Sequence, residues 1–177
     1  MSVVFCSFSL LDKQLDRLQS EYSYYLSDLA KKMTDIIEQN GSISKETLEQ
    51  INGTKNLMLS FVNDAFAPMG KQLLSNQSKL SFALKDGTEI NIQKLSAGEK
   101  QMLIILLTVL LERNEEYIVL LDEPEISLHI EWQYKLIDML LQLNPNAQFI
   151  LSTHFPSIFA NGWGDKIIYM EDIVKEK

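Results

Sequence analysis

One stretch in the second half of the chain constrains the fold most, because it alternates helical and strand-like segments at short intervals. A helix is expected from Ser96 to about Arg113, and Tyr117–Leu121 is a continuous apolar run. Such a run is typical of a strand buried on both faces. A second helix is expected at Ile130–Leu143, with a strand at Ala147–Leu151. This alternation predicts an α/β fold with a parallel sheet and flanking helices.

Four further strands are predicted outside this core. The runs Lys79–Leu84 and Glu89–Ile92 flank an Asp-Gly pair, which is a strong signal for a β-hairpin. Another strand is expected at Lys166–Met170. Residues 2–8 are rich in Val and Phe and predict a short first strand.

The region between the first strand and the hairpin predicts two helices. The first carries an apolar seam with steps of three and four residues, made of Leu11, Leu15, Leu18, Tyr22, Tyr25 and Leu29. It ends at Asn40-Gly41, and a second helix is expected over Ser44–Phe66 with an interruption near Asn52-Gly53. The pair forms either a projecting helical hairpin arm or a helical subdomain packed on the core, and the seam is too short to separate these alternatives.

Composition limits the classes of partner and compartment. A net charge of −8 and a pI near 4.8 give no general electrostatic basis for binding DNA, although a local basic patch would remain compatible. The longest apolar run, Met102–Leu111, is too short to cross a bilayer. Cys6 is the single cysteine, so no internal disulfide can form, and no signal peptide is apparent. A cytoplasmic protein without a membrane partner is expected.

Polar residues follow two of the predicted strands, at the strand ends where ligands of α/β sheets bind. Asp122 and Glu123 come directly after one buried strand, at the sheet edge where ligands of open α/β sheets bind. Asp122 could hold Mg²⁺, and Glu123 could orient or deprotonate a water molecule. His154 follows the next strand, where an imidazole could sense a phosphate or cap a turn.

The segment Leu95-Ser96-Ala97-Gly98-Glu99 begins a helix. A hydroxyl, a small residue and free helix N–H groups can together hold an anion. Ser96 with Glu99 three positions later is equally a capping box, and both functions are compatible.

These motifs resemble those of ABC-type ATPases of the SMC and overcoming-lysogenization-like group. LSAGE resembles the signature motif, YIVLLDEP the Walker B strand, and the histidine after ILST the switch histidine; DEPE-x-x-LH is typical of this group. The resemblance implies the C-terminal half of a P-loop NTPase that hydrolyses ATP. In it, Asp122 would hold Mg²⁺, Glu123 would be the general base and His154 would sense the γ-phosphate.

The resemblance also implies dimerisation. Leu95 to Glu99 would contact ATP across a nucleotide-sandwich dimer, formed with a second copy or with another ABC-type half-site. His129 would fall in the D-loop, where a partner contact and a structural role are both open. Ala97 and Glu99 depart from the residues usual in transporters and place the chain nearer the non-transporter branches. The inserted arm and the DEPE sequence disfavour a transporter subunit.

The Walker A motif is missing from this sequence. The Gly-Lys pair Gly70-Lys71 has Ala65 in place of the first glycine and Gln72 in place of the hydroxyl. The chain alone is therefore expected to be inactive, either as a fragment or as a half whose phosphate loop comes from another chain. The alternative function is a non-catalytic dimerisation or scaffold module. The expected domains are a strand at 1–9, a helical insertion at 10–75 and a C-terminal ATPase lobe at 76–177.

Overall fold

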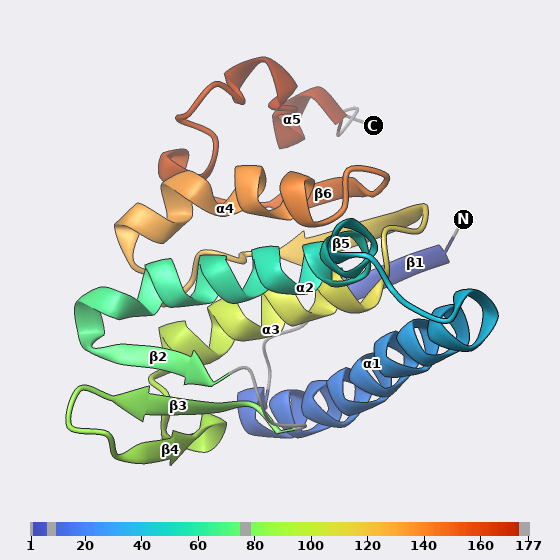
Figure 1. Ribbon diagram of the computed structural model, residues 1–177. Helices are drawn as coiled ribbons and strands as arrows, with labels where there is room; N and C mark the ends of the chain where they lie inside the picture. The colour runs from blue at the N-terminus through green and yellow to red at the C-terminus, as the bar shows by residue number, and fades with distance from the viewer. Residues whose placement is uncertain (1, 7–9, 75–78, 174–177) are drawn as a thin grey trace.

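Two small sheets and four long helices organise the chain in the computed structural model, which describes residues 2–6, 10–74 and 79–173 (Figure 1). The first sheet is parallel, in the order β1-β5-β6, and the second is antiparallel, in the order β2-β3-β4. The elements are β1 (Ser2–Cys6), α1 (Leu11–Asn40), α2 (Lys45–Phe66), β2 (Lys71–Leu74), β3 (Ser81–Leu84), β4 (Glu89–Asn91), α3 (Ala97–Leu111), β5 (Tyr117–Asp122), α4 (Ile130–Leu143), β6 (Gln148–Ser152) and the short α5 (Met170–Ile173).

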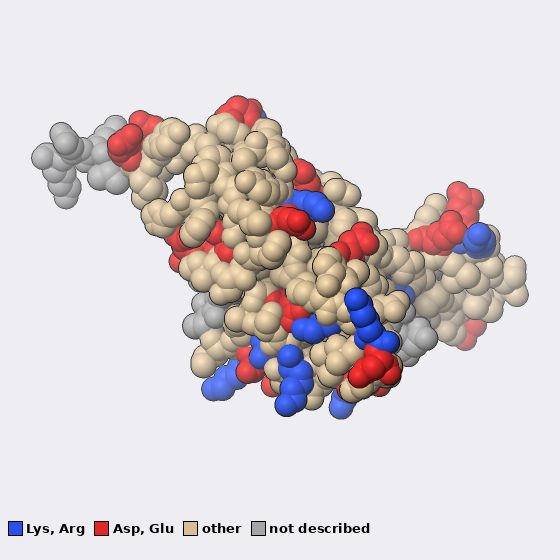
Figure 2. Space-filling model, turned by 90° about the vertical axis from the view of Figure 1, so that its left-hand side faces the viewer, with Lys and Arg blue, Asp and Glu red and all other residues tan. Residues whose placement is uncertain are grey.

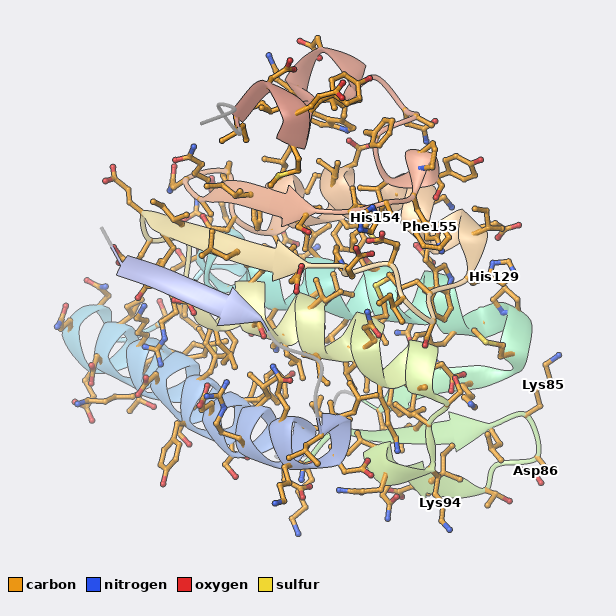
Figure 3. All side chains as sticks on the ribbon, turned by 180° about the vertical axis from the view of Figure 1, so that it is seen from behind. Lys85, Asp86, Lys94, His129, His154 and Phe155 are labelled. Atoms are coloured by element: carbon orange, nitrogen blue, oxygen red, sulfur yellow. The ribbon has the colours of Figure 1, made fainter. Side chains whose placement is uncertain are left out.

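The parallel sheet confirms the predicted α/β class. The strands β5 and β6 are joined by α4, and β1 from the start of the chain pairs with β5. Val119 and Leu121 are buried against the helices, while Ile118 and Leu120 on the other face of β5 are only half-buried and Ile150 of β6 is 49% exposed. Burial of β5 on both faces was therefore a wrong prediction. In Figure 3, α2, α3 and α4 all lie behind the sheet, so these three helices cover the same face of it.

Helix α3 is the centre of the core, as its nearly continuous apolar sequence predicted. Every residue from 101 to 110 is buried, so the helix has neighbours on all sides. Helices α1, α2 and α4 and the antiparallel sheet supply those neighbours. This central position fixes where α3 begins, which matters for the site below.

The helical hairpin is part core and part projection. The seam of α1, from Leu15 to Leu29, is buried against the core, as is the end of α2 from Met58 to Phe66. Between Leu29 and Met58 the chain has no buried residue. The base of the hairpin is thus packed on α3, and its distal part extends away from the core (Figure 1).

Three local predictions need correction. Helix α2 runs without a break through Gly53, because packing of its second half outweighs the cost of about 1 kcal/mol for an interior glycine. Residues 167–169 form no strand, and the segment ends in α5; Ile168 and Tyr169 are exposed, so no neighbouring strand pairs with it. Strand β2 was missed, since Lys71–Leu74 is short and lacks β-branched residues.

The predicted hairpin is present as β3 and β4, joined by a turn in which Gly87 has a φ of 83°. The first strand prediction is confirmed for Ser2–Cys6, and its remainder lies outside the described residues. Within the described part of the chain, no helix has the length and apolar character needed to traverse a membrane.

Candidate functional site

The carboxyl ends of β5 and β6 carry the predicted polar residues to one edge of the sheet. Asp122 of β5 lies opposite Ser152 of β6, and the Glu123 N–H donates to the Ser152 carbonyl at 2.9 Å. Figure 3 shows His154 and Phe155 at this edge, which is also the end of the molecule where α3 begins. The structure therefore places the strand-end residues and the start of α3 at the same end.

Glu123 and His154 meet at this edge. The imidazole Nε2 of His154 lies 3.1 Å from Oε1 of Glu123. The Glu123 side chain is 22% exposed and that of His154 is 88% exposed, so the pair borders solvent with its histidine outward. Glu123 has a φ of 47°, a left-handed conformation that side-chain-bearing residues rarely adopt and that is common at functional sites.

Asp122 provides an exposed carboxylate beside this pair. No group of three or more acidic, His or Cys side chains suited to a metal occurs among the described residues. Mg²⁺ is commonly held by only one or two carboxylates together with phosphate oxygens and water. An exposed strand-end carboxylate therefore fits Mg²⁺ that arrives with a nucleotide.

The start of α3 is a complete capping box. The Glu99 N–H donates to the Ser96 hydroxyl at 3.3 Å, and the Ser96 N–H donates to a Glu99 carboxylate oxygen at 2.7 Å. Ser96 and Ala97 are exposed, whereas Leu95, Gly98 and Glu99 are buried. Of the five residues predicted to contact a nucleotide, only Ser96 and Ala97 are thus open to an incoming ligand in this structure.

A buried ion pair holds this helix start against the antiparallel sheet. Nζ of Lys71, in β2, lies 2.7 Å and 2.6 Å from the two carboxylate oxygens of Glu99. Burial by itself would raise the pKa of Glu99, but the hydrogen bonds from Lys71 and Ser96 outweigh it and lower that pKa below its usual value. Glu99 is therefore an ionised structural residue.

Gly98 is explained by packing. A Cβ on Gly98 would lie 2.2 Å from the Ser127 carbonyl oxygen, which is closer than atoms can approach. Ser127 belongs to the turn that follows β5 and has a φ of 69°. The glycine consequently lets the start of α3 touch the turn that carries Glu123.

His129 caps α4. Its Nδ1 accepts from the Glu131 N–H at 3.4 Å, and its ring lies 6.2 Å from that of Trp132 at a tilt of 57°. Its side chain is exposed at the same end of the molecule as His154 (Figure 3). The structural role is thus present, and a partner contact stays a prediction.

A buried polar network behind Glu123 was missed by the sequence analysis. Glu125 is 1% exposed and accepts a hydrogen bond from the Thr153 hydroxyl. Burial raises the pKa of Glu125, the bond from Thr153 lowers it in part, and the nearby Glu123 carboxylate raises it again. The signal was available, since Glu125 and Thr153 are polar positions beside the predicted catalytic residues.

Two glutamines tie this network to the helices. The Gln101 amide of α3 donates to the Pro124 carbonyl at 2.6 Å, and the Gln133 amide of α4 donates to the Leu128 carbonyl at 3.0 Å. The Gln133 oxygen accepts from the Ser157 hydroxyl at 2.5 Å. The turn after β5 is therefore anchored to both α3 and α4, and the segment after β6 is anchored to α4.

The strand-end face carries both signs of charge. In Figure 2, which views this end of the molecule, Lys and Arg side chains gather toward the bottom, at the height of the antiparallel sheet, with acidic side chains among them. Lys85, in the turn between β3 and β4, and Lys94, just after β4, lie beside that sheet (Figure 3). No single-sign surface of the kind that binds nucleic acid is visible on this face.

Among known proteins, the chain is similar to two that are named probable ATPases. The chain is 28% identical over 179 residues to the Retron Vc95 probable ATPase of Vibrio cholerae serotype O1 biovar El Tor, covering 88% of this chain and 34% of that protein. It is 29% identical over 147 residues to the Retron Ec83 probable ATPase of Escherichia coli, covering 75% of this chain and 27% of that protein. The chain thus spans about a third of the length of these relatives or less.

Solved structures show a weaker likeness. An Smc head bound to the C-winged helix domain of ScpA matches with 18% identity and a TM-score of 0.43, over 67% of this chain and 40% of that one. The Smc head with an extended coiled coil bound to the C-terminal domain of ScpA, derived from Pyrococcus furiosus, matches with 17% identity and a TM-score of 0.41, over 88% and 50%.

A family profile matches residues 13–160, which include both helices of the hairpin, the start of α3 and both strand ends. On that match, the chain belongs to the family described as AAA domain, putative AbiEii toxin, Type IV TA system.

Proposed function

We propose that this chain supplies the signature, Walker B and switch-histidine side of an ATP hydrolysis site. The observation that carries the proposal is the Glu123–His154 contact of 3.1 Å, made between the ends of two adjacent parallel strands beside the carboxylate of Asp122. Membership of this family and the two relatives named probable ATPases support ATP as the nucleotide that is bound. The phosphate-binding loop would come from a further segment of the protein or from a partner chain.

Each residue has a distinct role in this mechanism. Glu123 would accept a proton from the water that attacks the γ-phosphorus, as the bond to the departing ADP breaks. His154, at the solvent side of Glu123, would donate a hydrogen bond to the γ-phosphate. Asp122 would hold Mg²⁺, which would supply positive charge to offset the charge on the phosphates.

The start of α3 would act on a nucleotide held across a dimer, with a second copy of the chain or an ABC-type half-site. Ser96 and Ala97 are exposed at the first turn of a helix whose N–H groups favour an anion. Leu95, Gly98 and Glu99 would contribute by placing that turn. His129, exposed at the same end, would lie near the partner.

The test is ATP hydrolysis by the natural protein, together with any partner chain that supplies the phosphate loop. Glu123→Gln should lower kcat at least about a hundredfold and leave ATP binding intact, because the amide cannot accept the proton. Glu116→Gln, an exposed glutamate at the other end of β5, is the matched control and should hydrolyse ATP normally.

Unchanged hydrolysis in Glu123→Gln would contradict the proposed base. If the wild-type protein binds ATP in a dimer and never hydrolyses it, the alternative of a non-catalytic scaffold module takes its place.

A further inference from the structure

We propose that Glu125 is a positioning residue that holds Glu123 and His154 in register, by binding the turn after β6 to the turn after β5 through Thr153. This inference rests on the proposed ATPase function and adds a residue to it. Glu125 itself touches neither a nucleotide nor the attacking water, so it acts through its two neighbours.

The first step of the argument is the chain of hydrogen bonds that reaches His154. The Thr153 hydroxyl donates to Glu125, and the same hydroxyl accepts from the Phe155 N–H at 3.0 Å. His154 lies between Thr153 and Phe155 in the sequence, so hydrogen bonds hold the backbone on both sides of it. A single buried carboxyl group thus determines where the His154 side chain leaves the backbone.

The second step concerns the Glu123 side of the contact. Glu125 lies two residues after Glu123 in a turn closed by backbone bonds, from Ile126 N to the Glu123 carbonyl at 3.2 Å and from Leu128 N to the Glu125 carbonyl at 2.9 Å. Because both residues belong to this one hydrogen-bonded turn, a shift of Glu125 would move Glu123. Glu123 in a left-handed conformation depends on such support.

A simple packing role does not explain a glutamate at position 125. A buried glutamate costs free energy unless its polar atoms are satisfied, and one Glu125 oxygen, Oε2, meets no hydrogen-bond donor among the described residues. No cation partner of Glu125 occurs in the described part of the chain either, unlike Glu99 with Lys71. An apolar residue would fill this position at lower cost, so the carboxyl group is retained for what it binds.

The experiment compares kcat and KM for ATP in the natural protein and four variants. Thr153→Val removes only the hydroxyl and should lower kcat about 10- to 100-fold, the size expected of a small misplacement of a catalytic group, with KM within about twofold. Thr153→Ser keeps the hydroxyl and should restore most of kcat. Glu125→Gln keeps an oxygen acceptor and should stay near wild type, whereas Glu125→Met should match Thr153→Val.

The matched control is Thr108→Val in α3. Thr108 is buried, and its hydroxyl meets no partner among the described residues, so the same chemical change should leave kcat unchanged. A kcat near wild type in Thr153→Val or Glu125→Met, with Glu123→Gln inactive, would overturn the positioning role alone. Activity retained in Glu123→Gln would instead overturn the ATPase function.

If circular dichroism shows that Thr153→Val does not fold, the two Glu125 variants test the positioning role instead. Loss of kcat in folded Glu125→Met with activity in Glu125→Gln supports the proposal, and equal activity in both contradicts it. The double variant Glu125→Met/Thr153→Val should be no slower than the slower single variant, because both remove one shared interaction.

Discussion

Glu99 and Glu125 are two glutamates, each 1% exposed, that lie at the same end of the molecule. Their pKa values are shifted in opposite directions. Glu99 is bound by the Lys71 ammonium and by the Ser96 N–H, and its pKa is lowered. Glu125 is bound by the Thr153 hydroxyl, stands near the Glu123 carboxylate, and its pKa is raised. Burial raises the pKa of both groups; at Glu99 the hydrogen bonds from Lys71 and Ser96 outweigh burial, whereas at Glu125 the bond from Thr153 does not, and the nearby Glu123 carboxylate adds to the rise.

This contrast distinguishes a structural carboxylate, Glu99, from a carboxyl group that lies next to the proposed catalytic residues, Glu125. A buried ion pair with satisfied hydrogen bonds fixes one geometry, which suits the start of α3. A buried carboxyl group without a cation is unfavourable in its charged form and is typical of sites that hold or pass protons. Three predictions test the contrast, from the largest effect to the smallest, and a fourth with a smaller effect tests a position far from both glutamates.

The largest effect is expected from Lys71→Met, which turns Glu99 into a buried carboxylate without a cation. Breaking a buried pair from one side should lower the free energy of unfolding by about 3–5 kcal/mol, measured by denaturant unfolding. The double variant Lys71→Met/Glu99→Met should recover most of that loss. A loss below about 1 kcal/mol, typical of exposed pairs, would contradict the assigned burial.

Gly98→Ala should come next, because its Cβ would collide with the Ser127 carbonyl between the two glutamate environments. Overpacking against backbone should cost about 1–3 kcal/mol in unfolding free energy. It should also separate α3 from the turn of Glu125 and so lower kcat for ATP. An alanine variant as stable as wild type would mean that the close contact between α3 and this turn is not present.

The pH dependence of stability should have opposite signs at the two glutamates. The lowered pKa of Glu99 gives stability that is present above the unfolded pKa of about 4.5 and is lost as pH falls through the folded pKa. The raised pKa of Glu125 gives stability that is present below about pH 4.5 and is lost as pH rises through the folded pKa.

Thermal unfolding from about pH 2 to about pH 8 tests this pair of signs, because the Glu99 effect changes below its unfolded pKa of about 4.5 and the Glu125 effect changes above it. Relative to wild type, Glu99→Gln should become less stable as pH rises, and Glu125→Gln should become more stable, each by a few °C. If the stability of both variants relative to wild type changed in the same direction with pH, the proposed difference between Glu99 and Glu125 would be wrong.

The smallest effect is expected from Gly53→Ala, far from both glutamates. No atom lies within 4 Å of the added Cβ, and Gly53 is inside helix α2. Alanine should raise the unfolding free energy by about 0.5–1 kcal/mol. A destabilising result would show that the unbroken course of α2 through Gly53 is wrong.

The sequence predicted the elements that carry strong periodic signals and missed those that depend on distant neighbours. Helix α4 has the predicted limits, and α3 and β5 differ by one to a few residues. Strand β2 could not be predicted from four residues, and with it the partner of Glu99 was missed. Burial of both faces of β5 was wrong because an apolar run reports hydrophobicity and not how many layers cover it.

The candidate site followed the same division. The edge positions of Asp122, Glu123 and His154 came from strand ends, which sequence reveals well. The Glu125–Thr153 bond joins residues 28 positions apart, and the burial of Glu125 arises only when α3 and α4 close over the turn. Such contacts depend on tertiary packing, for which this single sequence carries no periodic signal.

The pairing of β1 with β5 has a consequence for how this protein folds. Ser2 lies opposite Tyr117, whereas Ile118 of β5 lies opposite Gln148, so the first pairing closes a loop several times longer than the second. Loop closure grows more costly with length, and parallel pairing between distant strands is slow. The β5–β6 unit should therefore form first, and until β1 arrives, β5 keeps an open strand edge that invites pairing with other chains. Of these three strands, the one synthesised earliest would thus be the last to pair.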